Sequence, residues 1–460
     1  MKKTKIVCTI GPASENKETM KSLIEAGMNV MRMNFSHGDF VEQGFRIKNL
    51  KELNKENNWH VGMMLDTKGP EIRTGELADN GYGGVELTKG DIIRLTMDYS
   101  FKGNKDKVAI SYPGLYDDIN VGGRILIEDG LLTLTVIEKD ETCRELVCRI
   151  ENNRKLKNKR NCNVPGVILN MEYISPKDKG DIEFACDNDC DFIAASFVRR
   201  AQDIKDIREI LKAKGNDHIK IISKIENQEG VSNMDEIIEL SDGVMVARGD
   251  LGVDVDAWDL PAIQKEMIAK AQQAGKIVIT ATQMLDSMQA NPKPTRAEVT
   301  DCHNAVLDGT SATMLSGESA QGDYPLEAVT YMAKIDERAE EFINYDELME
   351  NALQGVYECS NEEALGCAIA KVAYEFGTSA IIAEGEELAW ALSHYRPCAN
   401  VIAYVGCERC ARSLSLAWGV TAIVGSYEEA YKFACEKLEL TEGDSVIKAT
   451  KDGFTFVNVK

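Results

Sequence analysis

The sequence predicts an α/β protein built on a (β/α)8 TIM barrel, with an inserted all-β lid domain and a C-terminal α/β domain. Two observations support this fold class. Through most of residues 1–344, apolar runs of strand length alternate with helical patterns, which is typical of parallel strand–helix–strand units. Between residues 70 and 165 the alternation stops, and strand-like segments follow one another between Gly- and Asp-rich turns.

The first part of the barrel, residues 1–69, is expected to supply three strands. The helical spacing of Met20, Leu23 and Ile24 separates the first two strands, and Gly27 is suited to end that helix. The expected strands are Lys5–Ile10, Met28–Met33 and Val61–Leu65.

The lid, residues 70–165, is expected to contain strands and no helix. Its clearest strand-like segments are Asp91–Thr96, Arg124–Ile127 and Leu131–Ile137.

The second part of the barrel, residues 166–344, is expected to supply five more strands. They are Asp191–Phe197, His218–Glu226, Gly243–Arg248, Lys276–Thr282 and Ser311–Leu315. Three strands before the lid and five after it make eight, the number of a (β/α)8 barrel, in which catalytic residues follow the carboxyl ends of the strands. A doubly wound open sheet is the alternative.

Residues 345–460 are expected to form a separate α/β domain. Its predicted elements are a helical stretch over 347–377, a strand at Ala380–Ala383, a helix at Glu387–His394, and strands at Val401–Tyr404 and Ala422–Val424.

Charge composition excludes some classes of partner. The chain has 53 Lys and Arg residues against 75 Asp and Glu residues, a formal net charge of −22. Such an acidic chain lacks the cationic surface that nucleic acid or an anionic membrane would require. No apolar run reaches the length of a membrane span. Phosphorylated small molecules stay possible, since a few local cations can hold them.

The amino terminus and the cysteines favour a cytoplasmic protein. Residues 1–12 carry three lysines and no apolar segment of signal-peptide length. Thirteen cysteines are scattered along the chain, and one CxxC, Cys407 to Cys410, has no further zinc ligands at comparable spacing. We expect these cysteines to be reduced structural thiols.

Charged side chains gather at the predicted strand ends. Lys224 and Glu226 are two residues apart, so both point to the same side of their strand. Glu226 and Asp250, from neighbouring strands, would place two carboxylates on one magnesium ion. Lys224 beside that ion would stabilise the charge of a transferring phosphoryl group. The structural alternative is an ordinary ion pair between Lys224 and Glu226.

A second pair of charged residues, Arg32 and Asp66, follows the second and third strands. A salt bridge that ties these two strands together is an equally good interpretation of this pair. The recurrence of such residues at successive strand ends argues for a site, because scattered surface charges would not favour one end of the sheet.

Several short segments at these strand ends occur in a specific order. They are Thr4–Ser14, Asn34–Gly38, Leu65–Gly75, Ile221–Asn227, Met245–Gly252, Ala281–Leu285, Pro294–Glu298 and Met314–Glu318. Together they resemble the motifs of the pyruvate kinase family, and the resemblance covers most of the chain. The family fold is a barrel with a lid after the third strand and a C-terminal α/β domain, in agreement with the strand count.

The resemblance implies a glycolytic phosphotransferase that moves the phosphoryl group of phosphoenolpyruvate to ADP, giving pyruvate and ATP. It implies Mg²⁺ (or Mn²⁺) and K⁺ as cofactors and a homotetramer as the assembly. Glu71 stands where potassium-dependent members of the family have Glu, which favours potassium dependence.

The resemblance also implies residue roles. Lys224, Thr282 and Arg32 match catalytic positions, and the substrate contacts match Arg32, Lys224, Gly249, Asp250 and Thr282. The divalent-ion ligands match Glu226 and Asp250, and the potassium ligands match Asn34, Ser36, Asp66 and Thr67. The nucleotide contacts match Asn34, His37, Arg73 and Lys159.

Some residues depart from the family pattern. Asp254 replaces a Glu that is one methylene longer, and Gln321 replaces a Lys near the barrel mouth. The turn Ala383–Glu387 carries three carboxylates where members that respond to a sugar bisphosphate have Thr and Ser. Carboxylates repel phosphate, so we expect no bisphosphate activation through this turn.

Two alternatives to an active kinase are a catalytically silent regulatory relative and a magnesium-dependent barrel lyase acting on enolates. The silent relative predicts the loss of a key cation or carboxylate, yet Lys224, Glu226 and Asp250 are all present. The lyase leaves the lid, Arg73 and Lys159 without a function.

Overall fold

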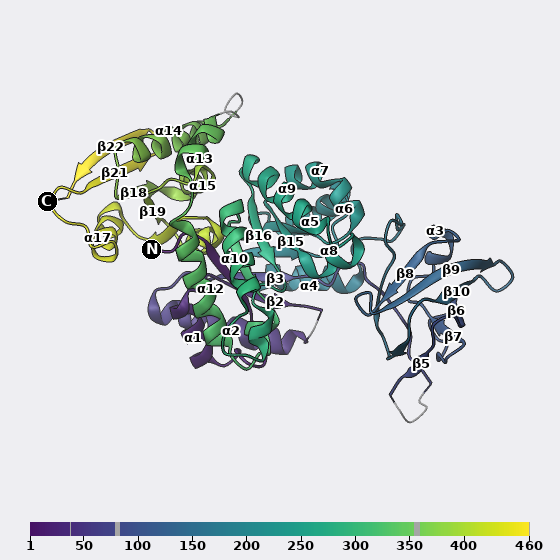
Figure 1. Cartoon of the computed structure of the whole chain (residues 1–460). Helices are drawn as coiled ribbons and strands as arrows, with labels where there is room; N and C mark the ends of the chain where they lie inside the picture. The colour runs from purple at the N-terminus through teal and green to yellow at the C-terminus, as the bar shows by residue number, and fades with distance from the viewer. Residues whose placement is uncertain (37, 79–82, 354–358, 460) are drawn as a thin grey trace.

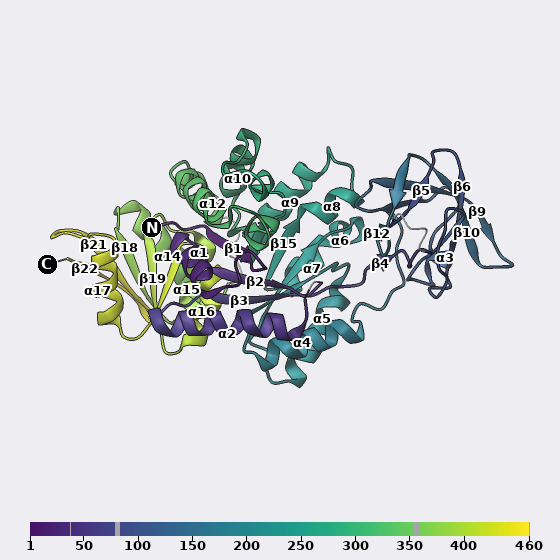
Figure 2. The ribbon, with the colours of Figure 1, turned by 90° about the horizontal axis from the view of Figure 1, so that it is seen from below.

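The computed structural model describes residues 1–36, 38–78, 83–353 and 359–459, and its parts lie in a row (Figure 1). The barrel is in the middle, the lid projects from one end of it, and the C-terminal domain lies at the other end. The same order is seen from below in Figure 2, where the amino terminus lies beside the C-terminal domain.

A closed parallel barrel with the strand order β1–β17–β16–β15–β14–β13–β3–β2 confirms the predicted fold class. The closed sheet is incompatible with the doubly wound alternative. Each strand falls on a predicted segment: β1 (Lys5–Thr9), β2 (Val30–Asn34), β3 (Gly62–Asp66), β13 (Phe192–Ala195), β14 (Lys220–Ile225), β15 (Gly243–Ala247), β16 (Ile277–Ala281) and β17 (Ala312–Leu315).

Helices surround these strands and cover the apolar side chains between the two layers (Figure 2). They are α1 (Lys17–Ala26), α2 (Phe40–Asn57), α4 (Pro176–Asp187), α5 (Ala201–Ala213), α6 (Gln228–Ser232), α7 (Met234–Leu240), α8 (Arg248–Asp254), α9 (Leu260–Gln273), η1 (Asp286–Gln289), α10 (Arg296–Asp308), α11 (Gly317–Ala320) and α12 (Pro325–Glu340).

Local sequence explains where these helices begin and end. The Asn16 side chain accepts a hydrogen bond from Thr19 N at the start of α1, and Gly27, at φ 126°, ends that helix. Met20 and Leu23 form its buried face, as their spacing predicts. Asp39 and Glu42 form a capping box at the start of α2.

The lid contains a seven-stranded sheet, β4–β12–β8–β9–β10–β6–β7, and the pair β11–β5. Its strands are β4 (Ile72–Arg73), β5 (Val85–Leu87), β6 (Ile92–Thr96), β7 (Lys107–Ala109), β8 (Arg124–Ile127), β9 (Leu132–Asp140), β10 (Glu145–Ile150), β11 (Arg154–Leu156) and β12 (Asn161–Asn163). The expectation of no helix is wrong, because Leu115–Asp118 forms α3. A single turn is too short to show a helical period in the sequence.

The C-terminal domain has a five-stranded sheet, β20–β19–β18–β21–β22. Its strands are β18 (Ala380–Glu384), β19 (Asn400–Val405), β20 (Val420–Val424), β21 (Ser445–Thr450) and β22 (Gly453–Asn458). The sequence did not predict the antiparallel hairpin β21–β22. The helices are α13 (Tyr345–Leu353), α14 (Asn361–Glu375), α15 (Gly385–Tyr395), α16 (Glu408–Ser413), η2 (Leu414–Leu416) and α17 (Tyr427–Lys437). The described part of the expected helical stretch 347–377 therefore belongs largely to α13 and α14.

Buried polar contacts fasten this domain to the base of the barrel. Arg412 on α16 lies with its Nε 3.1 Å from both carboxylate oxygens of Asp191, just before β13. The Lys5 ammonium on β1 donates to Val420 O, and Arg396 donates to Gly309 O. Burial lowers the pKa of Lys5 to about 7. The domain therefore covers the end of the barrel opposite the carboxyl ends of the strands.

Cys407 and Cys410 form a disulfide at the start of α16, so the expectation of reduced thiols is wrong for this pair. Their Cα atoms are 5.3 Å apart, which is within the range that a disulfide spans. Among the described residues, no helix is long and apolar enough to cross a membrane.

Candidate active site

Lys224 lies at the carboxyl end of β14 among three acceptor oxygens. Its Nζ is 2.8 Å from Ser196 Oγ, 2.9 Å from Glu226 Oε1 and 3.2 Å from Asp66 Oδ1. Lys224 is 7% exposed and Asp66 is 1% exposed. The two carboxylates raise the pKa of Lys224 against the opposing effect of burial, so the ammonium keeps its charge.

The two carboxylate oxygens of Glu226 have different contacts. Its Oε2 accepts a hydrogen bond from the backbone N–H of Phe197 at 2.7 Å. Within the described residues, Oε1 accepts no hydrogen bond of good geometry, although it lies beside Lys224. Burial and the nearby Asp250 carboxylate raise the pKa of Glu226. A buried carboxylate, Glu226, that interacts with a half-buried one, Asp250, suits a divalent cation.

Arg32 and Asp66 form the salt bridge that the structural interpretation predicted. Arg32 Nε donates to Asp66 Oδ2 at 2.7 Å, and its Nη1 donates to Thr9 Oγ1 at 2.7 Å. Asp66 thus joins Arg32 to Lys224 through its two oxygens, and the two cations and Arg32's hydrogen bond hold the pKa of Asp66 below its usual range in spite of burial. The ion pair and the site are therefore one connected network.

Thr282 and Gly249 are brought together at the ends of β16 and β15. The backbone N–H of Gly249 donates to Thr282 Oγ1 at 2.7 Å, and that hydroxyl donates to Ala281 O at 2.6 Å. Thr282 has a φ of 68°, which is rare for a β-branched residue and costs conformational energy. Strained residues of this kind gather at functional sites, and here the strain turns the hydroxyl toward α8.

The predicted potassium ligands lie at the ends of β2 and β3, where Asn34 and Asp66 are register partners. Asn34 Oδ1 accepts from Ser36 N at 3.0 Å, and Thr67 O accepts from Ser196 Oγ at 2.7 Å. This set offers only oxygen ligands, which hard cations prefer. Among the described residues, no group of three or more His, Cys, Asp and Glu side chains forms a metal site.

The predicted nucleotide contacts Arg73 and Lys159 lie side by side in the lid. Arg73 Nη1 donates to Lys159 O at 2.9 Å, and its Nη2 pairs with Glu71 Oε1 at 2.6 Å. Lys159 Nζ pairs with Glu76 at 3.0 Å. Both cations therefore face carboxylates that an anionic nucleotide would have to displace. His37 lies outside the described residues.

Ser196 and Phe197, which follow β13, were missed as site residues. Ser196 lies near the end of a predicted strand, but nothing in the sequence distinguishes a serine with a role in the site from a structural serine at this position. Phe197 contributes its backbone N–H to Glu226 and has a φ of 53°. Sequence alone carries no signal for a positive φ at a phenylalanine.

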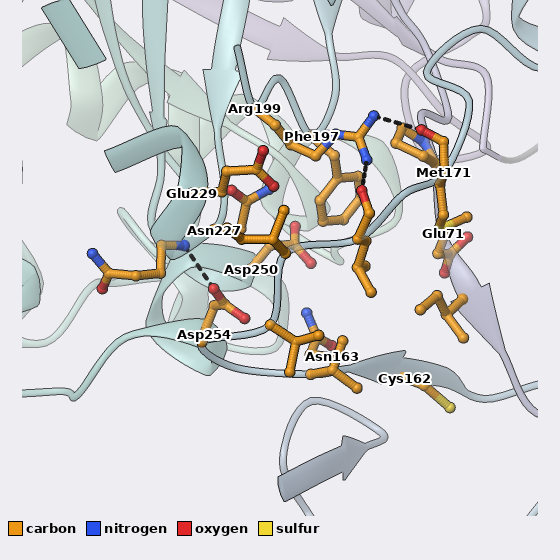
Figure 3. A pocket seen from close by; sticks show the side chains of 18 of the residues that line it. Glu71, Cys162, Asn163, Met171, Phe197, Arg199, Asn227, Glu229, Asp250 and Asp254 are labelled. Atoms are coloured by element: carbon orange, nitrogen blue, oxygen red, sulfur yellow. Dashed lines mark hydrogen bonds between the residues drawn. The ribbon is translucent and has the colours of Figure 1, made fainter. Parts of the chain in front are cut away.

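A cavity of about 380 Å³ opens between the barrel and the two connections to the lid (Figure 3). Figure 3 shows Asn227, Glu229 and Asp254 on its barrel side, Cys162 on the lid strand β12, and Met171 on the chain that returns from the lid. Among the predicted catalytic and divalent-ion residues, only Asp250 lines it. The cavity therefore adjoins the charged network and does not coincide with it.

The departures from the family pattern have defined contacts. Asp254 Oδ2 accepts a hydrogen bond from Gln228 N at 2.6 Å, which joins the end of α8 to the start of α6. Gln321 Nε2 contacts Gln289 Oε1 at 3.3 Å. Residues 383–387, expected as a turn, form the end of β18 and the first turn of α15, where Glu386 accepts from Ser413 Oγ at 2.5 Å. None of these contacts involves Lys224, Glu226 or Asp66.

Comparisons with known proteins agree with the fold and with the order of the motifs. A family model described as "Pyruvate kinase, barrel domain" matches residues 1–329. The chain is 48% identical over 439 residues to the pyruvate kinase of Bacillus licheniformis, covering 95% of this chain and 74% of that protein. It is 46% identical over 458 residues to the pyruvate kinase of Lactobacillus delbrueckii subsp. bulgaricus, covering 97% and 77%.

A solved structure is similar over the whole chain. The crystal structure of a pyruvate kinase from Cryptosporidium parvum superposes with a TM-score of 0.95 at 38% identity, covering 100% of this chain and 96% of that one. A match of this extent includes barrel, lid and C-terminal domain. The chain therefore belongs to the pyruvate kinase family, enzymes that transfer the phosphoryl group of phosphoenolpyruvate to ADP to form pyruvate and ATP.

Proposed function

We propose that this phosphoryl transfer takes place at the carboxyl ends of the barrel strands, with Lys224 as the central catalytic residue. The single observation that carries the proposal is the buried ammonium held between Asp66 and Glu226. A cation fixed in a water-poor site stabilises charge that develops on a transferring phosphoryl group far better than a solvated one. Arg32, held by Asp66, would add a second cation for the same phosphoryl group.

Glu226 and Asp250 would hold the divalent cation, Mg²⁺ or Mn²⁺. The interaction between the two carboxylates fits such an ion. So does Glu226 Oε1, which pairs with Lys224 but, within the described residues, accepts no hydrogen bond of good geometry. When bound, the ion supplies positive charge for the substrate carboxylate and phosphoryl oxygens. Gly249 and Asp250, on the first turn of α8, would contact the substrate there.

Thr282 would serve proton delivery to the enol that remains after phosphoryl transfer. Its hydroxyl sits between Gly249 N and Ala281 O, so it can accept and donate at once. A proton leaving that hydroxyl for the enol carbon would have to be replaced from water, because the backbone amide of Gly249 and the carbonyl of Ala281 have no proton to give up.

Asn34, Ser36, Asp66 and Thr67 would hold K⁺. Glu71 supports this assignment through the family resemblance, and its carboxylate pairs with Arg73 in the lid. Arg73 and Lys159, with Asn34 and His37, would contact ADP. The lid cations would then exchange their glutamate partners for phosphate oxygens when the nucleotide binds.

We further propose a cytoplasmic homotetramer, organised in segments 1–69, 70–165, 166–344 and 345–460, without bisphosphate activation at the junction of β18 and α15. The glycolytic activity of the family supports the compartment, and family analogy supports the assembly. The carboxylates of Glu384, Glu386 and Glu387 support the absence of a phosphate site.

The cation proposals are tested by following ADP-dependent pyruvate formation in a coupled assay while one ion is varied. We expect activity to require Mg²⁺ or Mn²⁺, and to fall when K⁺ is replaced by tetramethylammonium at equal ionic strength. Full activity in tetramethylammonium would contradict the potassium assignment. Full activity in the presence of a divalent-ion chelator would contradict the assignment of Glu226 and Asp250.

A further inference from the structure

Ser196 connects Lys224 to the third strand of the barrel. Its Oγ lies 2.8 Å from Lys224 Nζ, 3.1 Å from Asp66 Oδ1 and 2.7 Å from Thr67 O. A hydroxyl has one proton to donate and two lone pairs, so it accepts from the ammonium and gives its proton to the oxygens of residues 66 and 67. Ser196 is 2% exposed, and water cannot replace these bonds freely.

The backbone of Ser196 is also held by residues that follow β3 and by the chain that returns from the lid. Its N–H donates to Thr67 Oγ1 at 3.1 Å, and its carbonyl accepts from the Tyr173 hydroxyl at 3.0 Å. Gly69 packs so closely that a Cβ there would lie 2.7 Å from Ser196 O. Gly69 and Tyr173 belong to the two chain segments that lead into and out of the lid. Ser196 is therefore fixed by both of them.

The three oxygens around the ammonium differ in kind. Asp66 and Glu226 offer carboxylates, and Ser196 offers the one neutral oxygen. The two carboxylates attract the ammonium strongly, but they belong to two different strands. The position of the ammonium between them is therefore set by its hydrogen bond to the neutral oxygen of Ser196. Without the Ser196 hydroxyl, the Lys224 ammonium stays charged but is no longer held in one orientation.

We propose that Ser196 is a positioning residue that directs the Lys224 ammonium and couples it to the monovalent-cation ligands through Thr67. This inference rests on the proposed roles of Lys224 and Thr67. A cation held by Thr67 would fix the oxygens that Ser196 contacts. The Ser196 hydroxyl would then be fixed as well, and with it the position of the Lys224 ammonium. Removal of the hydroxyl should therefore weaken both the chemical step and the response to K⁺.

The test compares Ser196→Ala with Ser223→Ala. Ser223 is a fully buried serine on β14, next to Lys224 in sequence and therefore on the opposite face of the strand. Among the described residues, its hydroxyl is hydrogen-bonded to Ser241 Oγ at 2.7 Å and has no hydrogen bond with Lys224. We expect Ser196→Ala to lower kcat about 10- to 100-fold, since a hydrogen bond to a charged group is lost. We expect Ser223→Ala to leave kcat within about twofold.

A readout without turnover is the rise of the unfolding midpoint on adding K⁺, with tetramethylammonium as the reference ion. We expect Ser196→Ala to need a several-fold higher K⁺ concentration for the same rise, and Ser223→Ala to respond like wild type. If Ser196→Ala does not fold, Ser196→Cys keeps the volume with a poorer acceptor and is measured instead. An unchanged kcat together with an unchanged K⁺ response would overturn the proposal.

A double-mutant cycle shows whether Ser196 acts through the lysine. In a Lys224→Met background, Ser196→Ala should have almost no further effect on kcat, because the group that it directs is absent. A full additional loss in that background would overturn the proposal. If instead Lys224→Met alone keeps wild-type activity, the proposed function fails first, and the two failures are thereby distinguished.

Discussion

Lys224 and Glu226, two residues apart at the end of β14, meet with 2.9 Å between Nζ and Oε1 at the carboxyl end of the barrel. The pair is an ion pair, as the structural interpretation holds, but Asp66, Arg32 and Ser196 extend it into a buried network. An isolated ion pair needs no such extension. The arrangement keeps a cation and two carboxylates ready for substrate and metal in one place.

Glu226→Gln tests the divalent-ion assignment. The amide keeps the shape and removes the charge, so the Mg²⁺ concentration for half-maximal activity should rise at least about tenfold. Mn²⁺ binding followed by electron paramagnetic resonance should weaken in parallel. Glu229→Gln, on the wall of the neighbouring cavity, is the control and should keep the wild-type values. Equal metal affinity in Glu226→Gln and wild type would contradict the assignment.

Arg73→Ala tests the nucleotide assignment in the lid. We expect the KM for ADP to rise about 10- to 100-fold, because a charge-assisted contact to phosphate is lost, while the KM for phosphoenolpyruvate changes little. Arg94→Ala is a control in the same domain, since Arg94 pairs with Asp140 and Glu145 within the lid sheet. A larger effect on phosphoenolpyruvate than on ADP would place Arg73 at the other substrate.

Arg412→Ala tests the junction between the C-terminal domain and the barrel. The change leaves Asp191, 3% exposed, without its cation and should lower the free energy of unfolding by about 3–5 kcal/mol. Arg409→Ala, at an exposed position on the same helix, should change it by less than about 0.5 kcal/mol. Chemical denaturation monitored by circular dichroism measures both. Equal effects of the two variants would show that the buried pair does not stabilise the junction.

Asp336 gives the fold a pH dependence. The residue is fully buried on α12, accepts from Thr313 Oγ1 at 3.0 Å, and has its pKa raised by burial to about 8. Between the ordinary carboxyl pKa and about 8, the folded state binds more protons than the unfolded state, so stability from this group falls as pH rises. Relative to wild type, Asp336→Asn should become more stable as the pH is raised from 5 to 8. Parallel stability curves over that range would contradict this origin.

Much of the fold could be predicted because barrel strands carry a periodic signal. Each barrel strand overlaps an expected segment, although β2 and β3 each end one residue later than expected, at Asn34 and Asp66. Met20 and Leu23 are buried as their spacing requires. The hairpin β21–β22 is absent from the sequence prediction, although Asp452-Gly453 followed by alternating Phe454 and Phe456 is a pattern typical of a hairpin. The one-turn helix α3 carries no period at all.

The site divides in a similar way. Charged residues such as Lys224, Glu226 and Asp66 can be recognised from the sequence, because a charge at the end of an apolar strand requires a partner. Ser196 and Phe197 do not, since a neutral hydroxyl and a backbone N–H have no pattern in the sequence. Their contribution appears only when β13 and β14 are placed side by side.

The most direct test of the account is kcat for ADP-dependent pyruvate formation in Lys224→Met, with Lys220→Met on the same strand as the control. Lys220 lies at the opposite end of β14, with its ammonium 4.8 Å from the centre of the Trp390 ring. We predict that Lys224→Met folds and loses at least about 10²–10³-fold in kcat, whereas Lys220→Met stays near wild type. Folded Lys224→Met with near-wild-type kcat would contradict the central claim that the buried ammonium carries the phosphoryl transfer.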